Sequence, residues 1–146
     1  MNDKKILTLI EAQVVIKAII EEASKDSGRP IAIAVTDDRG DLISFVRMDG
    51  ARPRFGVRAI RKAYSAAYNG RDTRKSLENR QKWDWGAYEP VDSDTTVVPG
   101  GIAIVKPGET TVYGGIGTSC SRSADEEEAL ALVGLKALQT FIWQSQ

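Results

Sequence analysis

The fold is decided by residues 95–120, which read TTVVPGGIAIVKPGETTVYGGIGTSC. β-Branched residues dominate two runs in this stretch and glycines interrupt them, a pattern typical of strands joined by a tight turn. The turn falls at residues 106–109, and four of the 13 glycines lie between Gly108 and Gly117. Because glycine weakens a strand, we expect bulges or a close approach of other groups to the backbone. We predict that this hairpin forms the centre of a sheet and one wall of a small-molecule pocket.

The rest of the chain supplies further strands and the helices that cover them. Residues 31–36 read IAIAVT, typical of a strand buried on both faces, and residues 42–48 return from a turn at Gly40. Periodic apolar residues and two capping boxes predict helices over residues 7–27, 54–68, 76–85 and 123–145. Strands joined by hairpins make an antiparallel sheet, and helices must bury its faces. We therefore predict one α+β domain over residues 1–146, profilin-like, with about five antiparallel strands flanked by helices.

The amino-acid composition limits which partners the protein can be expected to bind and in which compartment it is expected to lie. The 20 basic and 20 acidic side chains cancel, so no global charge favours nucleic acid or an anionic membrane surface. No apolar run reaches the length of about 18 residues that a membrane span needs. Cys120 is the single cysteine, which fits a reducing compartment, and the N-terminus carries no signal-type apolar region. We expect a cytoplasmic protein that binds neither nucleic acid nor membrane.

The sequence contains no histidine. Its absence removes the usual general base, the usual nitrogen ligand of metals and the usual axial ligand of haem. The acid–base groups that remain are Asp, Glu, Lys, Tyr and Cys. The scattered carboxylates show no metal-loop spacing, so we predict no metal and no cofactor.

Basic residues crowd one short region around the second predicted helix. The cluster consists of Arg47, Arg52, Arg54, Arg58, Arg61 and Lys62. Such a cluster near a helix N-terminus can bind a carboxylate or phosphate, although a solvated face with ion pairs is the alternative. Lys62 stands among alanines, so we expect it to be partly buried, which requires a partner or a lowered pKa. Structural pairing of Lys62 with Asp49 or Glu127 is the competing interpretation.

Four smaller features are also candidates for the site. Asp49 follows Arg47 by two positions and either acts as an acid or base or closes the turn at Gly50. Backbone N–H groups near Gly100 and Gly101 form an anion site, unless these glycines serve only sheet geometry and close helix packing. The aromatic residues Trp83, Trp85 and Tyr88 either sandwich a flat ligand or belong to a subunit interface. Cys120 is either a buried, inert thiol or one activated by the following helix N-terminus.

Several segments in order carry a family resemblance: residues 47–51 (RMDGA), 61–67 (RKAYSAA), 99–101 (PGG) and 115–119 (GIGTS). With these segments the chain resembles the GlcG/HbpS-like family, also called the haem-degrading domain family, which is similar to the C-terminal domain of PduO-type proteins. The resemblance implies a five-stranded antiparallel sheet in a symmetric homo-oligomer. Some relatives bind haem or a related tetrapyrrole, and others resemble small lyases acting on modified aromatic acids. Glu127 replaces the usual Asp and residues 119–122 (SCSR) replace Ser-Gly-Gly, which predicts a changed ligand.

Three functional hypotheses follow. The first is a homo-oligomeric enzyme, dimer-based with tetramer and octamer as alternatives, that acts without metal on a small anionic carboxylate, aromatic acids included, in a lyase-type or hydrolytic step. In it Lys62, Glu127 and Asp49 move protons, and the ligand is held by the residues Arg47, Arg54, Arg58, Gly100, Gly101, Trp85 and Tyr88. The second is a haem or tetrapyrrole-binding protein, with iron held by Cys120, Tyr64, Tyr68 or Thr73. The third is a non-catalytic assembly protein.

Overall fold

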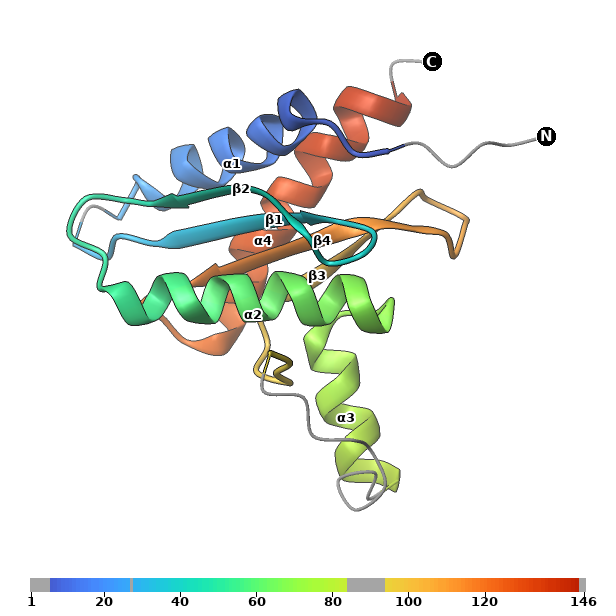
Figure 1. Ribbon diagram of the computed structural model, residues 1–146. Coiled ribbons are helices and arrows are strands. Elements are labelled where there is room, and N and C mark those ends of the chain that lie inside the picture. The colour runs from blue at the N-terminus through green and yellow to red at the C-terminus, as the bar shows by residue number, and fades with distance from the viewer. Residues whose placement is uncertain (1–5, 27, 84–93, 145–146) are drawn as a thin grey trace.

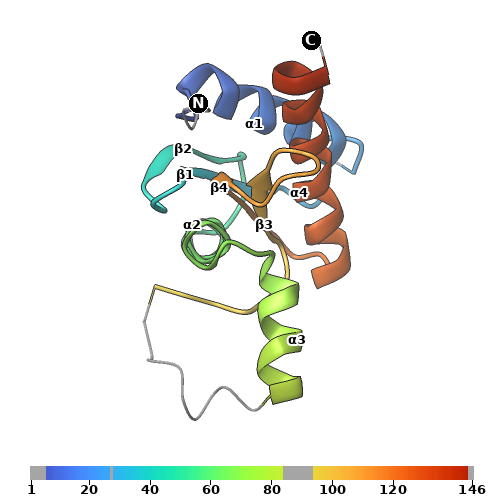
Figure 2. The ribbon, with the colours of Figure 1, turned by 90° about the vertical axis from the view of Figure 1, so that its right-hand side faces the viewer.

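The computed structural model describes residues 6–26, 28–83 and 94–144 and shows three layers, with helices on both faces of a sheet (Figures 1 and 2). The elements are, in chain order, α1 (Leu9–Ala23), β1 (Ala32–Asp37), β2 (Leu42–Arg47), α2 (Pro53–Asn69), α3 (Thr73–Trp83), β3 (Gly101–Val105), β4 (Val112–Ser119), α4 (Ala124–Gln139) and a π-helical turn (Thr140–Gln144). The α+β prediction is confirmed. Within the described residues the sheet has four strands, one fewer than expected.

The strands lie in the order β2-β1-β4-β3, and every neighbouring pair is antiparallel. β1 and β4 are therefore the central strands, which explains why β1 is apolar on both faces. The β3–β4 hairpin supplies one central strand and one edge strand, so the prediction that the whole hairpin forms the centre is corrected. Gly117 of β4 pairs with Ala34 on one side and with Gly101 on the other.

The two faces of the sheet are covered differently. α1 and α4 pack on one face, where large aliphatic side chains form the main core, among them Val15, Ile19, Ile33, Ile104, Ile116 and Leu138. α2 packs on the other face, where the buried cluster is built largely of alanine, with Phe55 near the start of the helix. The sheet thus has a thick apolar core on one side and a thin one on the other.

The helix boundaries follow local signals in the sequence. Both predicted capping boxes are present, Thr8 with Glu11 at α1 and Ser123 with Glu126 at α4. α2 ends at Gly70, whose φ of 68° is the left-handed conformation that glycine accepts most readily. α1 stops at Ala23, before the predicted end at residue 27.

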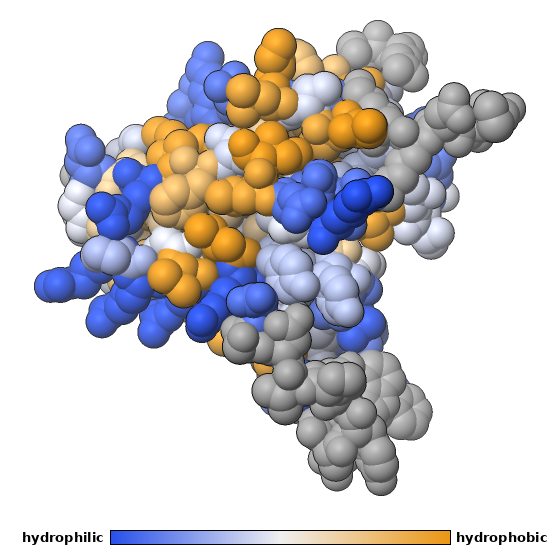
Figure 3. Space-filling model, viewed as in Figure 1, coloured by the Kyte–Doolittle hydropathy of each residue, from blue (hydrophilic) through white to orange (hydrophobic). Residues whose placement is uncertain are grey.

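Apolar side chains gather on the face of the molecule shown in Figure 3, over α1 and β2. Exposed large apolar residues include Ile10 on α1, and Leu42 and Phe45 on β2. A contiguous exposed apolar surface is typical of a protein–protein contact. The predicted homo-oligomer stays a prediction, and this is the surface on which to test it. Among the described residues, no helix combines the length and the apolar character needed to cross a bilayer.

Candidate functional site

A cavity of about 480 Å³ opens beside α2, where β4 passes into α4. We call it the Lys62 cavity. Three of its lining residues come from α2, three from the segment before β3, and four from the end of β4 and the start of α4: Arg58, Arg61, Lys62, Thr95, Thr96, Val98, Ser119, Cys120, Arg122 and Glu127. The described lining is therefore polar and rich in cations, and Val98 is its one large aliphatic side chain.

Lys62 is the buried charge of this cavity. Its side chain is only 2% exposed, and its Nζ donates to the backbone oxygen of Thr118 at 2.9 Å. The same Nζ lies 3.4 Å from Oε2 of Glu127, whose side chain is 8% exposed. The structure thus confirms that Lys62 is buried and selects Glu127, rather than Asp49, as its partner.

The start of α4 holds Glu127 in place. The Ser123–Glu126 capping box fixes the first turn, and negative charge in the first turn of a helix is favourable. Oε2 of Glu127 also accepts the backbone N–H of Cys120 at 2.7 Å, and Oγ1 of Thr118 donates to the backbone oxygen of Glu127 at 2.6 Å. These contacts lock the end of β4 to α4, so the carboxylate has little freedom to leave Lys62.

Burial sets the protonation of the cavity groups. Burial lowers the pKa of Lys62; the Glu127 carboxylate opposes this shift and the nearby charge of Arg58 adds to it. Burial raises the pKa of the Cys120 thiol. Cys120 is therefore a neutral thiol at ordinary pH, and the alternative of an activated thiolate is not supported. Lys62 can instead give up its proton more readily than an exposed lysine.

Arg58 and Arg61 are exposed at the rim, one turn apart on α2. Among the residues that the structure describes, neither forms an ion pair with a carboxylate, whereas Arg74 pairs with both Asp125 and Glu128. The wall opposite is fixed to α2, because Oγ of Ser65 accepts the backbone N–H of Thr96 at 2.7 Å. Two cations that pair with no carboxylate among the described residues thus line a polar hollow, an arrangement that favours an anionic ligand.

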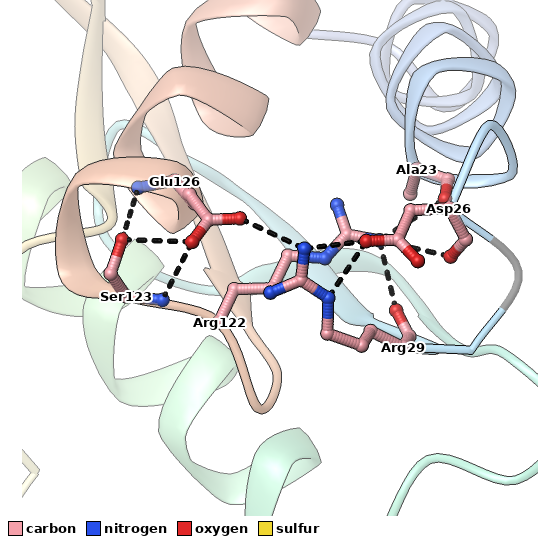
Figure 4. Close-up of polar contacts among 6 residues, drawn as sticks. All are labelled: Ala23, Asp26, Arg29, Arg122, Ser123 and Glu126. Carbon is pink, nitrogen blue, oxygen red and sulfur yellow. Dashed lines mark hydrogen bonds and ion pairs between the residues drawn. The ribbon is translucent and has the colours of Figure 1, made fainter.

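Arg122 also lines the cavity, but its guanidinium belongs to the scaffold (Figure 4). One of its terminal nitrogens donates to three backbone oxygens, those of Ala23, Asp26 and Arg29. Arg29 in turn bridges the carboxylates of Asp26 and Glu126. The network ties the end of α1 to the start of α4, so Arg122 contributes charge to the cavity from a fixed position.

Gly100 and Gly101 lie against Lys62, in agreement with the close-packing alternative. Gly100 has a φ of 122°, and a Cβ at this position would lie 2.9 Å from Nζ of Lys62. The backbone N–H of Gly101 donates to Oγ1 of Thr73 at 3.0 Å, so this group is not free to stabilise charge on a ligand. The anion-site interpretation of Gly101 is therefore corrected: both glycines allow close packing around Lys62.

The other predicted residues do not join this cavity. Arg47 and Asp49 line a separate hollow of about 440 Å³ with residues at the end of α1. Arg54 lies over the ring of Phe55, 5.2 Å from its centroid, near the start of α2. The structure therefore does not bring Asp49, Arg47 and Arg54 to the described lining of the Lys62 cavity.

The remaining aromatic candidates are Trp83, Trp85 and Tyr88. Trp85 and Tyr88 lie outside the described residues. Trp83 ends α3, but its side chain also lies outside the described part of the chain.

Sequence reasoning left several contributors to the cavity out of the predicted site, among them Arg61, Arg122, Ser119 and Thr96. Arg61 belongs to the same basic cluster as Arg54 and lies on the same side of α2, about two turns later, so only the position of the cavity along the helix separates the two. The departure from Ser-Gly-Gly at residues 119–122 was the one sequence signal for Arg122. The stretch 95–120 was predicted to form one wall of a pocket, but its contact with α2 through Thr96 was not predicted, because the hydrogen bond to Ser65 is long-range.

The candidates for iron ligation are scattered. Tyr64 and Tyr68 stack on each other with ring centroids 5.5 Å apart, and Tyr64 also packs against Gly40 in the β1–β2 turn. Thr73 is engaged with Gly101, and Cys120 is a buried thiol in the Lys62 cavity. In the described part of the chain, no three His, Cys, Asp or Glu residues are grouped as a metal site would need.

Comparisons with known proteins agree with this architecture. The family model described as haem-degrading protein HbpS-like matches residues 7–136. Protein GlcG of Escherichia coli K12 is 33% identical over 119 residues, covering 82% of this chain and 85% of that protein. The crystal structure of an HbpS double mutant from Streptomyces reticuli is 29% identical with a TM-score of 0.80, covering 94% of this chain and 90% of that one. A PduOC–haem complex, 21% identical with a TM-score of 0.79 and covering 91% of this chain and 95% of that one, shares the fold. The chain belongs to the HbpS-like family.

Proposed function

We propose that this protein binds a small organic carboxylate in the Lys62 cavity and transfers a proton on it, in a lyase-type or hydrolytic step. The observation that carries the proposal is the Lys62–Glu127 pair, buried with 3.4 Å between Nζ and Oε2 at the wall of a cation-rich cavity. The described residues offer no metal-ligand cluster, so the chemistry is assigned to the side chains themselves.

The buried pair is poorly explained as a device for stability. Removing two charges from water costs several kcal/mol per ion, and the attraction between them often does no more than offset that cost. Apolar side chains of similar size would stabilise this position as well. Perturbed titratable groups in a cavity are typical of functional sites, and the position of Lys62 and Glu127 beside the hollow fits that pattern.

Arg58 and Arg61 are the ligand-binding residues of this proposal. A guanidinium can hold a carboxylate through two parallel hydrogen bonds, which fixes orientation as well as affinity. Arg58 stands four residues before Lys62, so the two side chains emerge from the same side of α2, one turn apart. A carboxylate bound by Arg58 would place the rest of the molecule beside Lys62.

Lys62 and Glu127 are the proton-transfer residues. The lowered pKa of Lys62 brings its proton closer to the range in which a general acid and base exchange protons efficiently. Glu127 accepts the backbone N–H of Cys120 and remains oriented while it exchanges a proton. The pair can thus take a proton from a bound molecule and return it without reorganising the cavity.

A binding assay with a matched variant tests the proposal. Acetate, malonate, benzoate and phthalate are titrated against the wild type, R58Q and R54Q, with affinity measured by calorimetry. Loss of one charge-assisted contact is worth about 1.5–3 kcal/mol, so we expect R58Q to weaken binding by about tenfold or more. R54Q removes an arginine of the same helix outside the cavity and should bind as the wild type does. Equal affinities for R58Q and the wild type would remove the anion site, and no binding at all would favour the assembly hypothesis.

Haem binding is the second candidate, favoured by membership of a family described as haem-degrading. The Lys62 cavity fits a porphyrin poorly, because its described walls are mostly charged or polar and the sequence has no histidine. Of the candidate iron ligands, Cys120 lies in the described lining of the cavity. Titration with hemin while the Soret band is monitored decides the question: saturation at one hemin per chain, abolished by C120A, would replace the first proposal.

A further inference from the structure

Lys62 differs from every other lysine that the structure describes. The others are exposed or partly exposed, whereas Lys62 is buried and still lines a cavity. Its ammonium has three N–H donors, and its two hydrogen-bond and ion-pair partners among the described residues are Thr118 and Glu127. These two contacts use two of the three donors, and Lys62 also lines the cavity.

We propose that Lys62 is a nucleophile whose Nζ forms an imine with the carbonyl carbon of a small 2-oxo acid or aldehyde acid bound in the Lys62 cavity. This inference rests on the proposed function, because Arg58 must first hold the carboxylate of the same molecule. It goes further by naming the substrate class and a covalent step.

The surroundings favour the reactive form of the amine. Only a neutral amine attacks a carbonyl, and burial beside another cationic group is one way in which proteins activate lysine. Burial and the charge of Arg58 both act in that direction on Lys62. Glu127 lies 3.4 Å away and can hold the proton that the ammonium releases.

The spacing on α2 selects the position of the carbonyl. Arg58 and Lys62 lie on adjacent turns, and side chains four residues apart have Cβ atoms about 5–6 Å apart. A carboxylate held by Arg58 therefore directs a carbonyl on the neighbouring carbon towards Nζ, as a 2-oxo acid requires. The cavity of about 480 Å³ suits a small molecule.

The step balances within the site. The Lys62 ammonium gives a proton to Glu127, and the nitrogen then forms a bond to the carbonyl carbon while the C=O π pair moves to oxygen. A proton moves from nitrogen to that oxygen, giving a carbinolamine. Glu127 returns its proton to the hydroxyl, which leaves as water as the nitrogen lone pair forms the C=N bond. The product is a protonated imine beside an ionised Glu127, with no oxidant or reductant consumed.

Reductive trapping tests the inference. The full chain is incubated with pyruvate or glyoxylate and sodium cyanoborohydride, with lactate as the control that lacks a carbonyl. We expect one adduct per chain, heavier by the acid less one oxygen atom, on the peptide that contains Lys62. Because proximity raises the effective concentration of the carbonyl, labelling of Lys62 should exceed that of exposed Lys75 by more than about tenfold. Peptide mapping of the wild type assigns the site without relying on a variant that folds.

Variants separate the outcomes. K62R retains a cation beside Glu127 and should lose the adduct, while K75M should keep it. Lack of an adduct while carboxylates still bind in an Arg58-dependent manner would overturn the imine and leave the proposed function intact. Labelling spread evenly over exposed lysines would also overturn the imine. Absence of both labelling and carboxylate binding would remove the two proposals together.

Discussion

The two faces of the sheet are packed differently: large side chains separate the sheet from the helices on one face, and small residues let the helix lie close to the sheet on the other. Under α1 and α4 the sheet presents isoleucine, valine and leucine, and side chains fill the space between backbones. Under α2 it presents alanine and glycine, and the helix backbone itself comes close to β4. A Cβ added at Gly115 or Gly117 would lie 2.1 or 2.0 Å from the backbone oxygen of Ala63 or Ala59. The glycines that suggested a pocket wall therefore chiefly serve helix packing.

This difference explains where the site lies. A helix resting on backbone leaves no thick apolar layer, so a long side chain on its inner face reaches across the end of the sheet. Lys62 takes that path and meets Thr118 and Glu127. On the other face, large aliphatic side chains occupy the corresponding space. Close packing under α2 thus supplies both the burial and the fixed position that the proposed chemistry needs.

The largest effect is expected from G117A. The new methyl would lie 2.0 Å from the backbone oxygen of Ala59 and 2.6 Å from the backbone nitrogen of Ala63. Because backbone cannot move aside as a side chain can, α2 must shift, and we expect a loss of more than about 4 kcal/mol in the free energy of unfolding. Urea denaturation measures it. G28A, with nothing within 4 Å of the new Cβ, is the control. A G117A protein as stable as this control would refute backbone-to-backbone packing under α2.

The next effect is expected from E127Q, which breaks the buried pair on the same side of the sheet. The amide oxygen can still accept the N–H of Cys120, so the variant reports the lost charge. Breaking a buried pair costs about 3–5 kcal/mol, and we expect the lower end of that range at neutral pH. E128Q, which weakens a partly exposed pair with Arg74, should cost less than about 1 kcal/mol. An equal loss in the free energy of unfolding of the two variants would show that the buried pair contributes no more to stability than the partly exposed one.

The pH dependence of E127Q gives a second readout. Burial lowers the pKa of folded Lys62 and Glu127 raises it, so removing Glu127 should lower that pKa further. For a lysine with a lowered folded pKa, the penalty of the buried charge is complete below that pKa and is lost as pH rises towards the unfolded value of about 10.4. The difference in the free energy of unfolding between E127Q and the wild type should therefore shrink as pH rises through the lowered pKa of Lys62. If this difference in the free energy of unfolding stayed constant up to pH ~10, the buried charge of Lys62 would not be the cause of the lower stability of E127Q.

The sequence predicted the fold better than the site, because fold signals are local. The capping boxes at Thr8 and Ser123 and the apolar run of β1 depend on neighbours in the chain, and each was confirmed. The site depends on how α2 is rotated against β4. That rotation brings Lys62 to Glu127 over 65 positions of sequence, whereas Arg54 lies more than two turns nearer the start of α2, over the ring of Phe55. Asp49 was misplaced because it follows the edge strand β2 and lies beside the end of α1.

The smallest effect is expected from G134A, the counterpart of G117A on the aliphatic face. Its new methyl would meet Cδ1 of Ile19 and Cγ1 of Val15, both at 2.7 Å, which are the tips of side chains rather than backbone. Overpacking costs about 1–3 kcal/mol, but alanine is better than glycine within a helix by about 1 kcal/mol. Because the side chains of Ile19 and Val15 can shift, we expect the free energy of unfolding to fall by less than about 2 kcal/mol. Urea denaturation measures it. A loss equal to that of G117A would mean that both faces are equally rigid, and the contrast that places Lys62 would fail.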